Sequence, residues 1–170
     1  MKKTLLLLAL LFSGLSFAQS EVINKYKYII IPEKFSFLKE NNKYNLNSLT
    51  KMVFEKYGFQ AYFTNDKMPD ELALNKCLAL YGDLKDESGM LSTGLAIQIK
   101  DCSGQVLYTS PEGKSKQKDY KKAYYEALRE ASASLVSLNY KYAGPATVAT
   151  TTQEIKPVPS SPAAAPVPVM

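Results

Sequence analysis

Short hydrophobic runs separated by turn-forming residues occupy the middle of this chain and predict a β-sheet. The run at 26–32 (YKYIIIP) is β-branched and aromatic, and it has apolar side chains on both faces near its end, which is typical of a buried central strand. The alternating run at 59–63 predicts a second strand. Three further strands joined by turns are expected at 77–84, 91–100 and 105–109.

Two other segments carry apolar residues at every third or fourth position, as amphipathic helices do. The first covers 45–57, with Asn45 as the expected N-cap and Gly58 directly after its end. The second runs from about 117 to 138 and contains alanines that would let it pack closely on a sheet. A short helix is also expected at 69–74.

The order of these elements predicts an α+β fold, a two-layer sandwich. A strand, a helix and a strand in succession form a crossover with parallel strands, and the three later strands form an antiparallel meander. The sheet is therefore expected to be mixed and five-stranded, with both main helices packed on it and one face partly solvated. The pattern leaves open whether the strand at 59–63 lies beside the first strand or across the meander.

The hydrophobic pattern of the meander also predicts its register. The apolar residues of the strands at 77–84 and 91–100 must share one face, which requires paired residue numbers that sum to an odd value near 177 or 179. These residues are Leu78, Leu80, Leu84, Leu95, Ile97 and Ile99.

The same register places Cys77 and Cys102 together on the opposite face. In an oxidising compartment they would form a disulfide that closes a loop of about 25 residues and contributes roughly 3 kcal/mol. Two free, partly buried thiols are the alternative. A redox-active pair is disfavoured, because the close C-x-x-C spacing is missing.

The first eighteen residues have the pattern of a secretory signal peptide. Lys2 and Lys3 precede an apolar run at 5–12, and small residues before Gln19 form a cleavage site after Ala18. A membrane anchor is the alternative, but the apolar stretch is interrupted and falls short of the about 20 residues that a spanning helix needs. We therefore expect export to the periplasm or the medium, without a membrane span.

A single domain is expected at 19–142, followed by a disordered tail at 143–170 that holds six of the nine prolines. Without Lys2 and Lys3 the chain has 19 basic and 16 acidic residues, a net charge of +3. Almost all of the cations are lysines, whereas arginine is favoured for bidentate recognition of bases and phosphates. Nucleic acid is therefore not an expected partner, and the oligomeric state is left open.

The chain contains no histidine. A Ser-His-Asp triad, a Cys-His dyad and a His-ligated zinc or copper site therefore cannot be built from it. Carboxylate chemistry of the glycosidase type and calcium binding survive this exclusion, but neither has a recognisable motif here. We expect no cofactor, no metal and no catalytic residue.

A lysine cluster around the start of the second main helix is a candidate site for an anion or a partner. Positive charge there opposes the helix dipole, and an acidic envelope protein or an anionic glycan or glycolipid could offset that cost. The alternative is a solvated, lysine-rich helix start. The residues are Lys114, Lys116, Lys118, Lys121 and Lys122.

Phe35 and Phe37 are a second candidate site, because they lie in the loop at 33–44, just past the end of the first strand. A loop attached to the core by these side chains is the alternative. The twelve tyrosines suggest stacking on sugar rings, but most of them, Tyr120 and Tyr124 included, are expected at core-facing or core-edge positions.

Three segments carry a resemblance to known proteins: SFAQ at 16–19, YIIIP at 28–32 and D-x-x-G-x-V-x-Y at 101–108. Over most of 24–138 the element order resembles the small exported α+β modules of bacterial envelope-assembly proteins and of many secreted Bacteroidota proteins. The resemblance includes no motif specific to one family and carries no active site.

Export, the missing histidines and the absence of catalytic spacing favour a non-catalytic binding or envelope-assembly module over an enzyme. A carboxylate-dependent glycan hydrolase and an inhibitor of an envelope enzyme are the alternatives.

Overall fold

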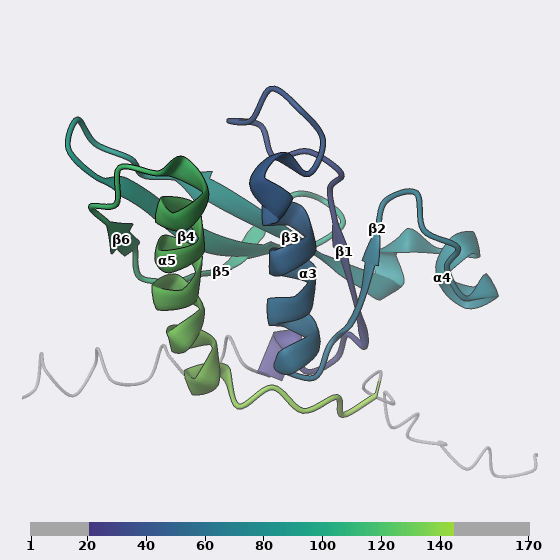
Figure 1. The fold of residues 1–170 in the computed structure, drawn as a ribbon. Helices are drawn as coiled ribbons and strands as arrows, with labels where there is room; N and C mark the ends of the chain where they lie inside the picture. The colour runs from purple at the N-terminus through teal and green to yellow at the C-terminus, as the bar shows by residue number, and fades with distance from the viewer. Residues whose placement is uncertain (1–20, 145–170) are drawn as a thin grey trace, which may run out of the picture.

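A mixed β-sheet forms one layer of the protein, and the helices α3 (Leu46–Lys56) and α5 (Tyr120–Ala133) cover one of its faces (Figure 1). The computed structural model describes residues 21–144. The expected leader at 1–18, its cleavage between Ala18 and Gln19, and the tail beyond residue 144 lie outside the described residues. The predicted α+β sandwich with two main helices is confirmed.

The sheet has the order β2-β1-β3-β4-β5, with β6 also paired to β4. The central strand β1 is parallel to both β2 and β3, and the other pairs are antiparallel. The strand after the crossover therefore lies beside the first strand, which answers the question that the sequence left open. The strands are β1 (Tyr28–Ile31), β2 (Gln60–Phe63), β3 (Ala79–Asp86), β4 (Thr93–Lys100), β5 (Val106–Thr109) and β6 (Gly113–Ser115).

The sixth strand was not predicted. β5 pairs with the end of β4 at Gln98–Lys100, whereas β6 pairs with its beginning at Thr93–Leu95. Pro111 lies between β5 and β6, where its missing N–H interrupts the ladder. β6 has only three residues, none of them a large apolar one, so it leaves no hydrophobic pattern to recognise.

The register of β3 and β4 has the predicted parity. Gly82 pairs with Ile99 and Leu84 with Ile97, so paired numbers sum to 181, one step beyond the predicted range. Leu78 was predicted on the core face, but it is 41% exposed and belongs to the 3-10 turn η2 (Lys76–Leu78). The side chain of Asn75 accepts a hydrogen bond from the N–H of Cys77 and stabilises this turn, so the strand begins only at Ala79.

α5 begins later than predicted, whereas α3 begins directly after its predicted N-cap, Asn45. α5 begins at Tyr120, because the side chain of Asp119 accepts a hydrogen bond from the N–H of Lys122 and caps the helix there. Its last predicted turns form the 3-10 helix η3 (Ser134–Leu138). Asn45 precedes α3 without a side-chain cap bond; instead, Oδ1 of Asn42 accepts from the N–H of Ser48.

The remaining helical turns are short. Gly58 follows α3 with φ +99°, a left-handed conformation that confirms the predicted helix end. The short helix α4 (Asp70–Leu74) follows Pro69 as predicted. The 3-10 turn η1 (Lys43–Asn45) leads into α3.

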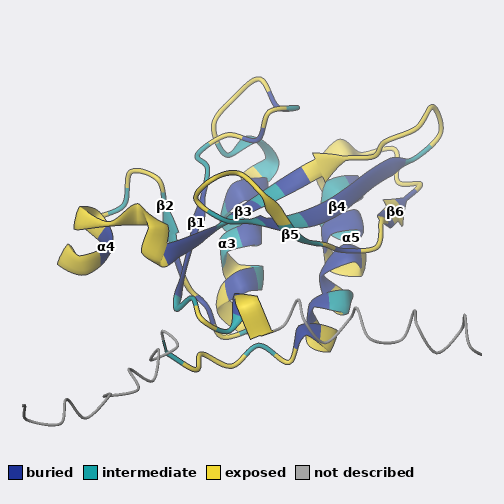
Figure 2. Ribbon diagram, turned by 180° about the vertical axis from the view of Figure 1, so that it is seen from behind, coloured by how far each residue is buried: buried dark blue, intermediate teal, exposed yellow. Residues whose placement is uncertain are grey.

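The main core lies between the sheet and the two large helices (Figure 2). Ile29, Ile31, Leu80 and Ile97 contribute to it from the sheet, and Phe54 contributes from α3. On the other face, a smaller cluster of Tyr28, Ile30, Leu72 and Ala79 packs beneath α4. That face is thus partly covered, and among the described residues no further layer packs on the outer sides of α3 and α5.

Asp66 protects the free edge of β2. Gln60 and Thr64 donate their N–H groups to β1, so the N–H of Phe63 points towards the unpaired edge. Oδ2 of Asp66 accepts from this N–H at 2.9 Å and lies 2.9 Å from Nζ of Lys51. The Phe63 N–H and then the lysine lower the pKa of the Asp66 carboxyl.

Asp66→Asn is therefore expected to destabilise the domain in a pH-dependent way. A carboxyl whose pKa is lowered by folding stabilises the native state above its unfolded pKa of about 4, and the contribution is lost as pH falls through the folded pKa. The side chain is partly exposed, so we expect less than about 1 kcal/mol. Melting temperatures between pH 7 and pH 2 should differ between wild type and variant only near neutrality, whereas Glu55→Gln on the surface of α3 should behave as wild type throughout. A difference that stays constant down to pH 2 would contradict this role.

Candidate functional site

A groove of about 550 Å³ lies between α3 and α5. Leu49 and Val53, one turn apart on α3, face Leu128 of α5 and form its apolar floor. Leu128 is buried, and the two α3 side chains are half-buried. The apolar residues at every third or fourth position turn each helix towards the sheet, and they also give each helix an apolar side that faces the other helix. The groove lies between these two sides.

The rim of the groove is positively charged. Lys56 of α3 and Lys122 and Arg129 of α5 are exposed along it. Glu126 is the carboxylate of the lining, and Oε2 of Glu126 accepts a hydrogen bond from Oγ of Ser115 at 2.5 Å. The lining therefore carries a net charge of +2.

The three rim cations are available to a ligand. Within residues 21–144 none of them forms an ion pair with a carboxylate. A long cationic side chain can cover an apolar floor with its methylene stem and keep its charge in water. The groove therefore offers an apolar surface and free positive charge at the same place.

The predicted lysine cluster is spread over three elements. Lys114 lies in β6, 2.9 Å from Glu112, and Lys116 and Lys118 lie in the segment before α5. Lys121 and Lys122 are in the first turn of α5, and of the five lysines only Lys122 lines the groove. Because the Glu112 carboxylate neutralises the charge of Lys114, this lysine does not add to the charge that a ligand could use.

Phe35 and Phe37 lie against the main core and not in the groove. Phe35 is fully buried, and its ring stacks on that of Phe37 with centroids 5.8 Å apart. Phe37 is half-buried and lies 5.9 Å from the ring of Tyr124 on α5. The geometry matches the second interpretation that the sequence allowed, a loop attached to the core.

The start of α5 carries an aromatic cluster that the sequence did not indicate. Tyr44 of η1 stacks on Tyr124 and Tyr120, with centroids 5.5 and 6.4 Å apart. Tyr120 was expected at a core-facing or core-edge position, but it is the first residue of α5 and is 65% exposed. Burial raises the pKa of Tyr124.

Cys77 and Cys102 form a disulfide with their Cα atoms 5.1 Å apart. The predicted pairing is thus present, although Cys77 lies in η2 and not in a strand. The bond connects this turn to the turn between β4 and β5, which holds the start of β3 to the end of β4.

A smaller cavity of about 310 Å³ lies near this disulfide, between the ends of β1 and β4 and residues 81–83 of β3. Its charged groups already have partners: Nζ of Lys100 and Oδ2 of Asp83 are 2.7 Å apart, and Asp101 accepts hydrogen bonds from its own turn. A ligand there would have to displace these contacts. The groove between the helices is therefore the stronger candidate site.

The described residues show no group of three or more Cys, Asp or Glu side chains arranged to hold a metal ion. Between residues 21 and 144, no helix combines the length and the apolar character needed to cross a membrane.

The sequence did not single out the groove or two of its three cations, Lys56 and Arg129. Leu49 and Leu128 belonged to the predicted helical stripes and were assigned to the core. The available signal was a cation next to the apolar stripe on both helices, but it identifies a groove only when the two helices are known to be neighbours.

No protein-family model matches this chain, and no curated protein matches it. Two solved structures of PelC dodecamers from Paraburkholderia phytofirmans are similar to it. One, a point variant, has 12% identity and a TM-score of 0.43 over 69% of this chain and 91% of that chain. The other has 11% identity and a TM-score of 0.42 over 69% and 90%. At this level the likeness says nothing about what this chain does.

Proposed function

We propose that this chain is an exported, non-catalytic binding module of the bacterial envelope, and that the groove between α3 and α5 holds an apolar group that carries negative charge. One observation carries the proposal: three free cations surround an apolar floor in a single groove. Such a surface suits an occupant that is both apolar and anionic, because a neutral polar ligand would neither cover the apolar floor nor pair with the cations.

The two features of the groove have different roles in binding. Covering the floor removes apolar surface from water, which contributes about 25 cal/mol per Å². The cations on the rim add less free energy, since they are solvated, but they orient an anionic group and speed its association. Affinity should therefore come mainly from the half-buried Leu49 and Val53, because Leu128 is already almost fully buried, and selectivity should come from the charges.

Export is supported by the disulfide between Cys77 and Cys102, since such bonds persist in oxidising compartments. The signal-peptide pattern at 1–18 also predicts export. In that environment an anionic, apolar partner would be another envelope protein or an amphiphile.

A carboxylate-dependent hydrolase is the competing proposal. The carboxylates around the α4 end of the sheet already have structural partners: Asp66 pairs with Lys51, and Glu71 accepts a hydrogen bond from the hydroxyl of Tyr28. Alanine at Asp66, Asp70 and Glu71 would abolish turnover of an envelope glycan if the chain were such an enzyme. If the chain is a binding module, the same three substitutions should leave the binding of an anionic apolar dye in the groove unchanged.

The anionic apolar dye 8-anilinonaphthalene-1-sulfonate is expected to bind the groove of the folded protein. Reversing the rim charge with Lys122→Glu and Arg129→Glu should weaken dye affinity about tenfold, equivalent to about 1.4 kcal/mol. Val53→Asp should weaken it as well, because it places a charge on the apolar floor. Fluorescence titration measures each affinity.

Lys67→Glu is the matched control, since it reverses an exposed charge that does not line the groove. It should leave the dye affinity unchanged. Thermal melts of all variants separate lost binding from lost folding. Equal dye affinity in wild type and in the double charge reversal would overturn the proposed site.

A further inference from the structure

The hairpin between β3 and β4 presents two large apolar side chains to solvent. Met90 is 99% exposed and Leu91 is 86% exposed, near the tip of the turn. Figure 1 shows this hairpin extending beyond the end of the sheet, away from α3 and α5. Two adjacent apolar residues that the rest of residues 21–144 leave almost uncovered call for an explanation, because exposed apolar clusters mark interaction sites.

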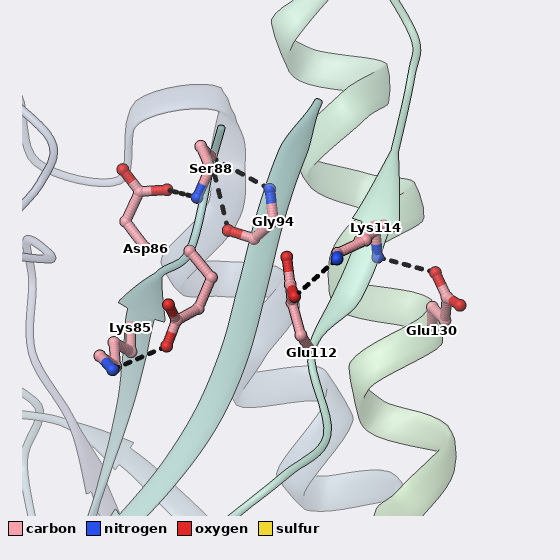
Figure 3. A network of polar contacts seen from close by, with 8 residues as sticks. Lys85, Asp86, Ser88, Gly94, Glu112, Lys114 and Glu130 are labelled. Carbon is pink, nitrogen blue, oxygen red and sulfur yellow. Dashed lines mark hydrogen bonds and ion pairs between the residues drawn. The ribbon is translucent and has the colours of Figure 1, made fainter. Parts of the chain in front are cut away.

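The turn holds these side chains in a fixed frame. The N–H of Glu87 donates to the carbonyl of Gly94, and the N–H of Gly89 donates to the carbonyl of Ser92, both at 2.9 Å. Oγ of Ser88 accepts from the N–H of Gly94 at 3.1 Å (Figure 3). A tip fixed before binding loses little conformational entropy on docking.

The base of the hairpin is negatively charged. Asp86 and Glu87 lie at its root, and Lys85 is 2.7 Å from Glu87 (Figure 3). On the adjoining β6 side, Lys114 is 2.9 Å from Glu112, and its N–H donates to Glu130 at 2.7 Å. This group contains four carboxylates and two lysines and therefore has a net charge of −2; its members are Asp86, Glu87, Glu112, Glu130, Lys85 and Lys114.

We propose that the hairpin tip of one copy docks in the groove between α3 and α5 of a second copy. Met90 and Leu91 would cover the floor formed by Leu49, Val53 and Leu128, while the net −2 of the hairpin base would face the net +2 of the groove lining. The inference rests on the proposed function, because it names the apolar, anionic occupant of that groove.

The two surfaces lie on different parts of the chain, so the contact is head-to-tail. After a single docking event one copy keeps an unused groove and the other keeps an unused hairpin, so further copies can add until the series of contacts closes into a ring or continues as a filament. A groove of about 550 Å³ is in the size range that takes a small ligand or a few side chains. The proline-rich segment at 145–170 is a weaker candidate occupant, because its one Glu and one Lys give its side chains no net charge.

Analytical ultracentrifugation of the chain from Gln19 to Met170 tests the docking. The mean mass of the wild type should rise with concentration up to about 1 mM, the weak end of specific association. Met90→Asp with Leu91→Asp should remain monomeric, and so should the groove variant Lys122→Glu with Arg129→Glu. Leu74→Asp replaces an apolar residue that is 89% exposed on α4, and it should associate as wild type does.

Mixing the two monomeric variants gives the decisive result. The hairpin variant keeps an intact groove and the groove variant keeps an intact hairpin, so one contact remains and the mixture should form a 1:1 dimer that grows no further. A wild type that stays monomeric at 1 mM, or a hairpin variant that associates like wild type, would overturn the inference. Dye binding in the groove that persists in such a monomer would leave the proposed function standing, so the two failures are distinguishable.

Discussion

Replacing Gly113 by alanine is expected to lower the free energy of unfolding by about 3 kcal/mol. Gly113 is buried in β6 directly beneath α5. A Cβ atom there would collide with the carbonyl oxygen of Ala127 and lie 2.5 Å from the backbone nitrogen of Ala131. Both contacts are with helix backbone, which cannot rotate away as a side chain can, so α5 or β6 must move.

Urea unfolding followed by circular dichroism measures this loss. Gly89→Ala is the matched control, because its new Cβ would lie 3.9 Å from Oγ of Ser92 and should change stability by less than about 0.5 kcal/mol. Dye binding by Gly113→Ala should also change, since a displaced α5 alters the width of the groove. An unfolding midpoint equal to that of wild type would show that α5 does not rest on β6 as described.

The main elements could be predicted from the sequence because their hydrophobic periods are long and unambiguous. The crossover, the meander and the parity of their register all follow from which side chains must be buried together. The disulfide followed from the same pattern. Cys77 lies in the 3-10 turn before β3 and not in the strand itself. It still bonds to Cys102, because this turn remains next to the turn between β4 and β5.

The errors have local causes that periodicity does not record. Three side chains bond to the backbone where elements begin: Asn42 accepts from the N–H of Ser48 in the first turn of α3, Asn75 stabilises the turn before β3, and Asp119 caps α5 at Tyr120. Side chains of this kind offer the backbone local hydrogen bonds that a hydrophobic pattern does not record. β6 was not predicted because its three residues, Gly-Lys-Ser, carry no hydrophobic pattern.

The candidate site is less accessible from the sequence than the fold. Lys56 and Arg129 are ordinary exposed residues on their own helices, and they become a site only because α3 and α5 lie side by side. The exposure of Met90 and Leu91 is likewise not visible in the sequence: the predicted strand at 91–100 begins with Leu91, whereas β4 begins only at Thr93 and leaves both residues in the turn. A pattern predicts burial, but only the structure shows which apolar side chains the fold leaves uncovered.

Phe35→Ala is expected to cost about 4 kcal/mol, the typical loss for a large aromatic side chain in a core. Phe35 has no exposed surface and packs in the main cluster with Ile31 and Leu46. The segment at 33–42 has no helix or strand of its own, so this ring and its neighbour Phe37 attach it to the domain. The sequence left two roles for Phe35, a ligand contact or a core attachment, because a loop has no period that fixes the direction of its side chains.

Phe37→Ala separates these roles, since Phe37 is half-buried at the edge of the same stack. If both rings attach the loop, urea unfolding should show a large loss for Phe35→Ala and a smaller one for Phe37→Ala, about 2 kcal/mol. Dye affinity of the folded fraction should stay at the wild-type value in both variants, because neither ring lines the groove. A Phe35→Ala protein as stable as wild type, with altered binding, would assign this side chain to a ligand and not to the core.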